Sequence, residues 1–325
     1  MPAGRVFLVM LVCLLLWTFL FGPTLKRAAE ASPTGARRTV ALDVLTPFVA
    51  VSDVLQITKL TDAIERALGR NPNVAPGGEI VLPPEPIPSS STGGGGHPKT
   101  VGPIRVPTGR NKLRVVVVGD SLASGLGFYL ERVLNPALVR VSPQGRISTG
   151  LARPDYFDWP AAMTQIVDNF RPDLVVIMLG ENDDQPLRNT TGQEVTPIGT
   201  NAWPPAYQQR VTDFMTLAAS KGARVIWVGL PNVRDPGRQE LIRRQDAIFQ
   251  RSAHAVKNAV YLDTYKRFST PTGGYTAYLT QGGTVIEVRE ADGVHFNSTG
   301  YTLLARDVAL LAERKFKLTP KAVTG

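Results

Sequence analysis

The stretch VVVVGDSLASGLG at residues 115–127 indicates the fold class and raises the question of function. Four consecutive valines favour a strand that is buried on both faces, as the strands of parallel sheets are. The strand is expected to cover 114–118, and a helix is expected from about 122 to 134. Packing does not require a serine at the turn between them, so Ser121 is a candidate nucleophile. Serine is also a favoured N-cap, so capping of the helix is the alternative role.

Strands and helices alternate along the rest of the chain. Apolar runs predict strands at 137–143, 173–179, 224–230 and 259–263, and helical spacing predicts helices at 159–169, 204–220, 238–254 and 299–314. This alternation predicts an α/β protein with a flavodoxin-like, three-layer α/β/α architecture around a central parallel sheet of five strands. Ligands bind beyond the carboxyl ends of such strands, where Ser121, Asn182 and Asp263 lie. A hairpin with a Gly-Gly turn is expected within 273–290.

The net charge does not indicate a nucleic-acid partner. The chain has 325 residues and a formal charge of +9. Residues 1–38 contribute +4 of this charge, since five basic residues there face only Glu30. The remaining charge is spread over the chain without an arginine-rich helix. A basic segment beside a membrane anchor explains the excess better, and we expect no nucleic-acid binding.

The cysteine and histidine content argues against a metal centre or a disulfide. Cys13 is the single cysteine, so neither an intramolecular disulfide nor a thiolate metal site is expected. The three histidines, His97, His254 and His295, are too scattered for a zinc cluster. We therefore predict no metal and no cofactor.

Residues 6–22 form an apolar run without a charge, which predicts a single N-terminal membrane helix. The run exceeds the usual apolar core of a signal peptide, about 7–15 residues, although AEAS at 29–32 offers a cleavage pattern after Ala31. Basic residues follow the run, and the positive-inside rule would keep the main domain in the cytoplasm. We nevertheless expect an extracytoplasmic domain at the cell membrane, or secretion after cleavage near Ala31. A buried N-terminal helix of a soluble protein is a third alternative.

Composition divides the chain into four parts. Residues 1–38 are the anchor or signal segment with its basic flank, and 39–70 have the pattern of amphipathic, membrane-proximal helices, broken by Pro47. Residues 71–111 include PPEPIPSSSTGGGGHPKT, a composition typical of a flexible linker. The predicted catalytic domain is 112–325.

A serine hydroxyl is a weak nucleophile until a base takes its proton, and that base must be oriented by a third group. His97 lies in the linker and His254 within a predicted helix, which leaves His295 as the candidate base. Asp292 precedes His295 by three residues, a spacing that can bring its carboxylate to Nδ1 and leave Nε2 facing Ser121. Asp292 with Gly293 is also a common turn pair, and Asn182 could equally be an ordinary turn residue.

Four blocks of this sequence resemble the SGNH, or GDSL-type, hydrolase superfamily. They are GDSL at 119–122, Gly150 within STGLARPDYFDWP at 148–160, GEND at 180–183 and DGVH at 292–295. The resemblance covers roughly 112–314, and it is closest to the bacterial envelope-associated branch. Glu181 departs from the pattern, because a small or hydroxyl residue is common there, and it would place a negative charge beside the site.

The resemblance implies a role for each matching residue. Ser121 would be the nucleophile, His295 the general base and then acid, and Asp292 the orienting carboxylate. The oxyanion would be held by the backbone N–H groups of Ser121 and Gly150 and by the side-chain amide of Asn182. Asp120 is expected to be structural. Five further residues could line the pocket or merely pack: Arg153, Asp155, Trp159, Trp203 and Tyr207.

The leading functional hypothesis is an extracytoplasmic serine esterase that cleaves ester-linked acyl groups, including O-acetyl groups of envelope polysaccharide. Its partners would be an acylated carbohydrate or another small ester, and the membrane through the N-terminal helix. An O-acyltransferase with the same covalent intermediate is one alternative. A catalytically inactive carbohydrate-binding module is another. The oligomeric state is left open.

Overall fold

The computed structural model describes two parts of the chain. The described residues are 4, 5, 26, 40, 42–47, 49 and 103–323. The chain divides into the units Met1–Glu79 and Ile80–Gly325. Every described residue of the first unit is helical. No helix among the described residues is both long and apolar enough to cross a bilayer.

Several predictions about the N-terminal third fall outside the described residues. They are the apolar run at 6–22 with Cys13, the cleavage position at Ala31, most of the two helices within 39–70, and the linker up to residue 102 with His97. The four-part division of the chain therefore stays a prediction.

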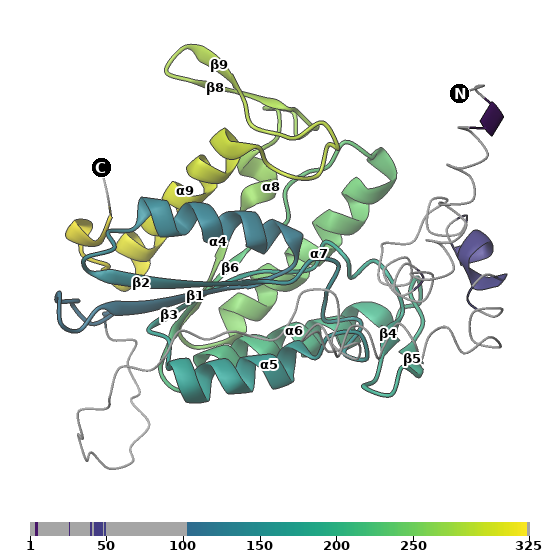
Figure 1. Cartoon of the computed structure of the whole chain (residues 1–325), viewed down its shortest axis with the longest axis horizontal. Coiled ribbons are helices and arrows are strands. Elements are labelled where there is room, and N and C mark those ends of the chain that lie inside the picture. The colour runs from purple at the N-terminus through teal and green to yellow at the C-terminus, as the bar shows by residue number, and fades with distance from the viewer. Residues whose placement is uncertain are drawn as a thin grey trace. The chain divides into compact units, whose positions relative to one another are not determined.

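A five-stranded sheet forms the centre of the second unit (Figure 1). Its strands lie in the order β2-β1-β3-β6-β7, and every neighbouring pair is parallel. The bounds are β1 Leu113–Gly119, β2 Val139–Gly145, β3 Leu174–Met178, β6 Arg224–Val228 and β7 Ala259–Leu262. Numbered among themselves, these strands follow the order 2-1-3-4-5 of flavodoxin-like sheets. The predicted fold class is confirmed.

Helices cover both faces of this sheet (Figure 1). On one face, α4 (Ser121–Val133) packs against α9 (Ser298–Phe316), with the Tyr129 and Tyr301 rings stacked 5.7 Å apart. The other face carries α5 (Trp159–Gln165), which continues as a π-helical turn over Ile166–Phe170, together with α6 (Trp203–Ala219) and α7 (Pro236–Ala255). On this face Trp227 of β6 lies between Phe214 of α6 and Phe249 of α7. The apolar runs of the strands are thus buried on both sides, which explains their unbroken valines.

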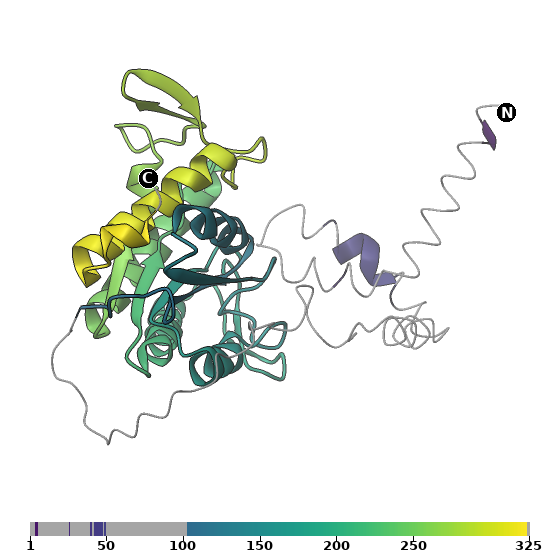
Figure 2. The same cartoon turned by 60° about the vertical axis from the view of Figure 1, so that its left-hand side comes forward.

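Four small elements complete the unit, one of them a 3-10 turn at Pro320–Ala322. The hairpin of β8 (Tyr278–Gln281) and β9 (Thr284–Glu287) turns at Gly282 and Gly283, as predicted, and it projects from the body of the unit in both views (Figure 2). The pair β4 (Leu187–Arg188) and β5 (Glu194–Thr196) and the single turn α8 (Thr264–Arg267) were not predicted. They are too short to produce a periodic pattern in the sequence.

Candidate active site

Ser121 is the first residue of α4, and one residue, Asp120, separates it from the end of β1. The chain turns sharply before it, because Gly119 has a φ of +142° and a Cβ there would run into the Met178 carbonyl. Asp120, and not Ser121, caps α4, since its Oδ1 accepts a hydrogen bond from the Leu122 N–H at 3.0 Å. The alternative that Ser121 serves as the N-cap is therefore wrong, and its hydroxyl is left for another partner.

His295 and Asp292 reach this hydroxyl from the loop before α9. His295 Nε2 lies 2.8 Å from Ser121 Oγ, and His295 Nδ1 lies 2.6 Å from Asp292 Oδ2. Asp292 Oδ1 also accepts the backbone N–H groups of Val294, at 2.8 Å, and His295, at 3.0 Å. Asp292 thus forms the turn and orients the imidazole at once. Partial burial opposes ionisation of Asp292, but the hydrogen bonds from His295 and from these two N–H groups outweigh it, so its pKa is lowered.

Arg289 holds the His295 loop in place, a role that sequence reasoning missed. Its side chain is fully buried, and it donates to the carbonyls of Val294, at 2.7 Å, and Asn232. Its guanidinium carbon lies 4.3 Å from the centroid of the Phe296 ring. Burial lowers the pKa of Arg289 to about 10, which leaves it charged at neutral pH. No sequence motif predicts this role of Arg289, because its partners are backbone carbonyls of two separate loops.

Two buried carboxylates join the loops that carry the other predicted site residues. Asp120 Oδ2 accepts the N–H groups of Gly180 and Glu181, both at 3.1 Å, and so ties the β1–α4 turn to the loop after β3. Asp183 accepts the N–H groups of Leu151 at 3.0 Å and Ala152 at 2.7 Å, and so ties that same loop to the one after β2.

Asn182 and Gly150 meet across this junction. Asn182 Nδ2 donates to the carbonyl of Thr149 at 3.1 Å, directly before Gly150. A Cβ on Gly150 would collide with Asp183 Oδ1, so only glycine fits beside the carboxylate. The loops after β1, β2 and β3 are therefore joined at the carboxyl edge of the sheet, and Asn182 and Gly150 share one side of the site.

Glu181 does place a carboxylate near the triad, as its position in the sequence suggested. It is buried, and its Oε1 lies 2.7 Å from Nη1 of Arg238, which also donates to the Glu181 carbonyl at 2.9 Å. The positive charge of Arg238 compensates the negative charge of Glu181 that was predicted beside the site. Burial raises the pKa of Glu181, while Arg238 and the more distant His295 and Arg289 oppose the shift.

The five flanking residues serve packing and local pairing. Trp159 Nε1 donates to Thr149 Oγ1 at 3.0 Å, and Trp203 Nε1 donates to the Gln185 carbonyl at 2.9 Å. Arg153 forms an ion pair with Asp155 at 2.7 Å, and the Tyr207 hydroxyl donates to Asp183 at 2.6 Å. Within the described part of the chain there is no group of three or more side chains that could hold a metal ion.

Buried carboxyls make the stability of the fold depend on pH. Burial raises the pKa of Asp120 to about 8, with Glu181 adding to the shift, and burial also raises the pKa of Glu181, Asp183 and Asp246. A carboxyl whose pKa is higher in the folded than in the unfolded state binds protons more tightly when folded. The free energy of unfolding should then fall as pH rises from about 4 to about 8. The lowered pKa of Asp292 has the opposite effect on the free energy of unfolding, but this effect changes with pH only below the ordinary pKa of 3.8.

We therefore expect a higher urea midpoint at about pH 5 than at about pH 8, followed by circular dichroism. The Asp120→Asn variant should show a smaller difference between the two conditions. A midpoint that rises toward pH 8 would contradict the assignment of raised pKa values to these carboxyls.

The site combines a serine, a glycine, an asparagine and a histidine block at one edge of a flavodoxin-like sheet. These are the four blocks on which the resemblance to SGNH-type hydrolases was based, and the structure places them at the same edge of the sheet.

Comparisons place the chain among known proteins. No curated protein matches it. Among solved structures it is similar to LAE5, an alpha/beta hydrolase enzyme from the metagenome of Lake Arreo, at 18% identity over 62% of this chain and 94% of that chain, with a TM-score of 0.43. A GDSL-like lipase from Bacteroides thetaiotaomicron is 19% identical over 62% and 88% of the two chains, with a TM-score of 0.43. A catalytic mutant of an acetylxylan esterase from Geobacillus stearothermophilus is 16% identical over 63% and 94%, with a TM-score of 0.42.

A family match covers most of the second unit. Residues 114–310, from β1 into α9, match the family described as "Protein of unknown function (DUF459)". This match spans more than half of the chain, and the protein therefore belongs to the DUF459 family.

Proposed function

We propose that this protein is a serine esterase that removes ester-linked acyl groups through an acyl-enzyme intermediate. The observation that carries the proposal is the pair of contacts at His295, 2.8 Å from Nε2 to Ser121 Oγ and 2.6 Å from Nδ1 to Asp292. Nucleophile, base and orienting carboxylate are within hydrogen-bond reach in the order that acyl transfer requires. An inert binding module would not require this chain of contacts.

The reaction runs in two steps. His295 Nε2 takes the proton of Ser121 Oγ as the oxygen attacks the ester carbonyl carbon. His295 then returns the proton to the alcohol oxygen when the bond between that oxygen and the acyl carbon breaks. A water molecule attacks the resulting acyl-Ser121 with His295 again as base, which releases the carboxylic acid and restores the hydroxyl.

The negative charge on the carbonyl oxygen needs fixed donors. The N–H of Ser121 is the first of α4, so it has no acceptor within the helix. In our proposal it stabilises the oxyanion together with the Gly150 N–H and the Asn182 amide. Each such donor typically contributes about 10²–10³ in rate.

The exposure of the triad favours hydrolysis of a bulky substrate. The side chains of His295 and Asp292 are 33% and 49% exposed. Water therefore reaches the acyl-enzyme, which favours hydrolysis over transfer to a sugar hydroxyl. An acyl group carried on a large alcohol such as an envelope polysaccharide can approach a site this open. We propose O-acyl groups, O-acetyl in the simplest case, of such a polymer as the substrate class.

The proposed location is extracytoplasmic, at the cell membrane. Its support is the charge-free apolar run at 6–22 followed by the Pro/Gly/Ser-rich linker. An alkaline phosphatase fused after residue 325 should be active in cells, because that enzyme matures only after export. An inactive but stable fusion would place the domain in the cytoplasm. The size of the cell-associated chain distinguishes a retained anchor from cleavage near Ala31.

The activity is tested with the purified full chain. We expect release of acid from p-nitrophenyl acetate and release of acetate from an O-acetylated polysaccharide. Acylated oligosaccharide formed in place of free acid would favour transfer instead. If neither product forms while a fluorophosphonate probe leaves Ser121 unlabelled, the proposal fails.

Asp292→Asn tests the orienting carboxylate. Asparagine keeps an oxygen for the backbone N–H groups of Val294 and His295 but presents no carboxylate to Nδ1. The imidazole then loses its preferred tautomer, and kcat should fall by about 10⁴-fold. Stability should change little, because the Asp292 side chain is half-exposed. Equal kcat values for the variant and the parent protein would show that Asp292 does not act on His295 during the reaction.

A further inference from the structure

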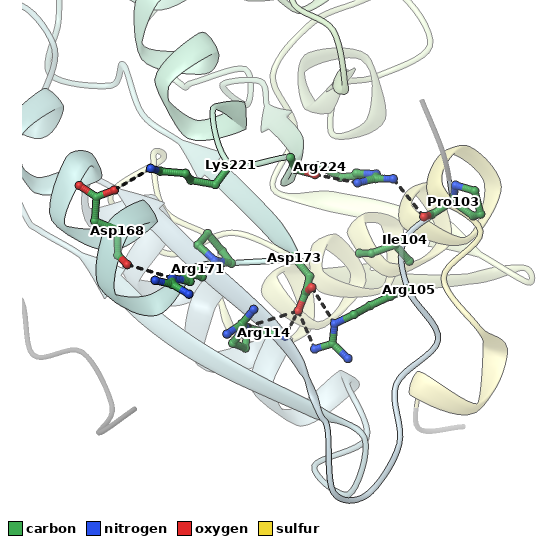
Figure 3. A pocket seen from close by; sticks show the side chains of 11 residues that line it. Pro103, Ile104, Arg105, Arg114, Asp168, Arg171, Asp173, Lys221 and Arg224 are labelled. Carbon is green, nitrogen blue, oxygen red and sulfur yellow. Dashed lines mark hydrogen bonds and ion pairs between the residues drawn. The ribbon is translucent and has the colours of Figure 1, made fainter. Parts of the chain in front are cut away.

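A second site candidate lies at the amino edge of the sheet, opposite Ser121. A pocket of about 520 Å³ opens where β1, β3 and β6 begin (Figure 3). Strand β1 alone separates it from Ser121 by roughly 20 Å, at about 3.3 Å per residue. The pocket therefore has no contact with the ester that Ser121 would attack, so the proposed esterase activity does not explain it.

The lining of this pocket is strongly basic. Five cationic side chains surround it against the two carboxylates of Asp168 and Asp173: Arg105, Arg114, Arg171, Lys221 and Arg224. A concave surface lined mainly by one sign of charge concentrates ions of the opposite sign. The pocket thus attracts anions.

One carboxylate is already fully engaged. Asp173 accepts two hydrogen bonds from Arg105, both at 2.8 Å, and a third from the Arg114 N–H at 2.8 Å. These contacts fix the segment before β1 against the start of β3. Asp173 and Arg105 therefore form a structural pair, and neither is the ligand-binding part of the pocket.

Three of the other cations, Arg114, Arg171 and Lys221, keep unused hydrogen-bond donors. Arg114 Nε is buried without a hydrogen bond, and it lies 3.7 Å from Asp173 Oδ2. Arg171 makes one long hydrogen bond, from Nε to the Asp168 carbonyl at 3.4 Å. Lys221 pairs with Asp168 at 3.2 Å, but both side chains are more than half exposed, so water weakens the pair. Figure 3 shows all three side chains at the pocket.

We propose that this pocket binds the phosphate group of an organic phosphate ester. Guanidinium groups with free Nη donors bind phosphate oxygens in pairs, and a lysine adds a point charge. The volume lies within the range of about 300–1,000 Å³ of small-molecule sites, which leaves room for the organic part beside the phosphate. The ligand is either a soluble phosphate ester or the phosphate headgroup of a lipid, and the same chemistry recognises both.

Calorimetric titration of the full chain with sn-glycerol 3-phosphate tests the site. We expect saturable binding that Arg171→Gln combined with Lys221→Gln weakens by about tenfold or more, as the loss of hydrogen bonds to a charged group implies. Both substituted side chains are exposed, so folding should be unaffected. The matched control combines Arg244→Gln with Arg306→Gln, two exposed arginines that do not line the pocket. It removes the same charge and should bind as the parent protein does.

Vesicles identify the source of the phosphate. The parent protein and both variants are mixed with phosphatidylcholine vesicles with and without phosphatidylglycerol. If phosphatidylglycerol increases vesicle binding by the parent protein but not by the Arg171→Gln, Lys221→Gln variant, the ligand is a lipid headgroup. If that variant loses only the binding of soluble glycerol phosphate, the ligand is a free ester. If the control variant loses as much binding affinity as the pocket variant, the binding is a general attraction between opposite charges, and the proposed site is overturned. The site is also overturned if the parent protein shows saturable binding neither to glycerol phosphate nor to vesicles that contain phosphatidylglycerol. Ester hydrolysis does not enter either readout, so failure here leaves the esterase proposal standing.

Discussion

Replacement of Ser121 by alanine should abolish ester hydrolysis by the purified chain, with kcat lower by about 10⁶-fold. The hydroxyl is the only atom that can form the acyl-enzyme in the proposed mechanism, and water has no comparable base-activated path without it. Residual activity would come from the oxyanion donors and from substrate binding alone. The decrease in kcat is measured from initial rates with p-nitrophenyl acetate, at enzyme concentrations high enough to detect a slow variant.

The loss should not come from unfolding. Asp120 provides the N-cap of α4, so removal of the Ser121 hydroxyl costs the helix nothing, and the thermal midpoint should stay near that of the parent protein. Ser124→Ala is the matched control, because Ser124 lies one turn along the same helix and its hydroxyl makes a weak 3.3 Å contact with the Asp120 carbonyl. It should retain the parent kcat. If Ser121→Ala hydrolyses ester at the parent rate, the nucleophile lies elsewhere.

A fluorophosphonate probe gives an independent readout of the same claim. The probe should add its mass to the peptide that contains Ser121 in the parent protein and in Ser124→Ala. It should leave Ser121→Ala unlabelled.

The fold could be predicted because its signals are local. The valines of β1 indicate a strand buried on both faces, and the regular alternation with helices implies a parallel sheet. The GDSL, GEND and DGVH blocks then gave residues that the structure brings together, since they lie at the end of β1, just after β3 and just before α9. The short pair β4–β5 escaped prediction because strands of two and three residues carry no periodicity.

The supporting contacts could not be predicted, because they join segments distant in sequence. Arg289 reaches the carbonyl of Asn232, 57 residues away, and an arginine on a loop gives no sign of such a partner. Glu181 was recognised as a charge beside the site, but its partner Arg238 was not, since the pairing depends on how α7 lies against the loop after β3. Nothing in the sequence distinguished Asp183, although it is the centre of the junction that joins the loops of Gly150 and Asn182.

Asp183→Ala should therefore damage stability and catalysis together. Asp183 is fully buried and accepts hydrogen bonds from Leu151 N–H, Ala152 N–H and the Tyr207 hydroxyl. Alanine would leave these three donors buried without an acceptor, and the free energy of unfolding should fall by about 3–5 kcal/mol. The loop that carries Gly150 would also lose two of its hydrogen bonds to the loop that carries Asn182, and the bond from Asn182 Nδ2 to the Thr149 carbonyl would still join them. Displaced oxyanion donors should lower kcat by about 10²-fold or more in the molecules that remain folded.

Tyr207→Phe separates the two effects. It removes one donor to the same carboxylate and keeps both backbone contacts, so it should cost about 1 kcal/mol of stability and leave kcat nearly unchanged. Urea unfolding followed by circular dichroism gives the stabilities, and kcat is measured at low temperature, where both variants are folded. Because Asp183 acts on catalysis only through the Gly150 and Asn182 loops, a folded Asp183→Ala protein with the parent kcat would show that these loops hold their positions without it. The oxyanion donors would then have to be sought elsewhere around Ser121.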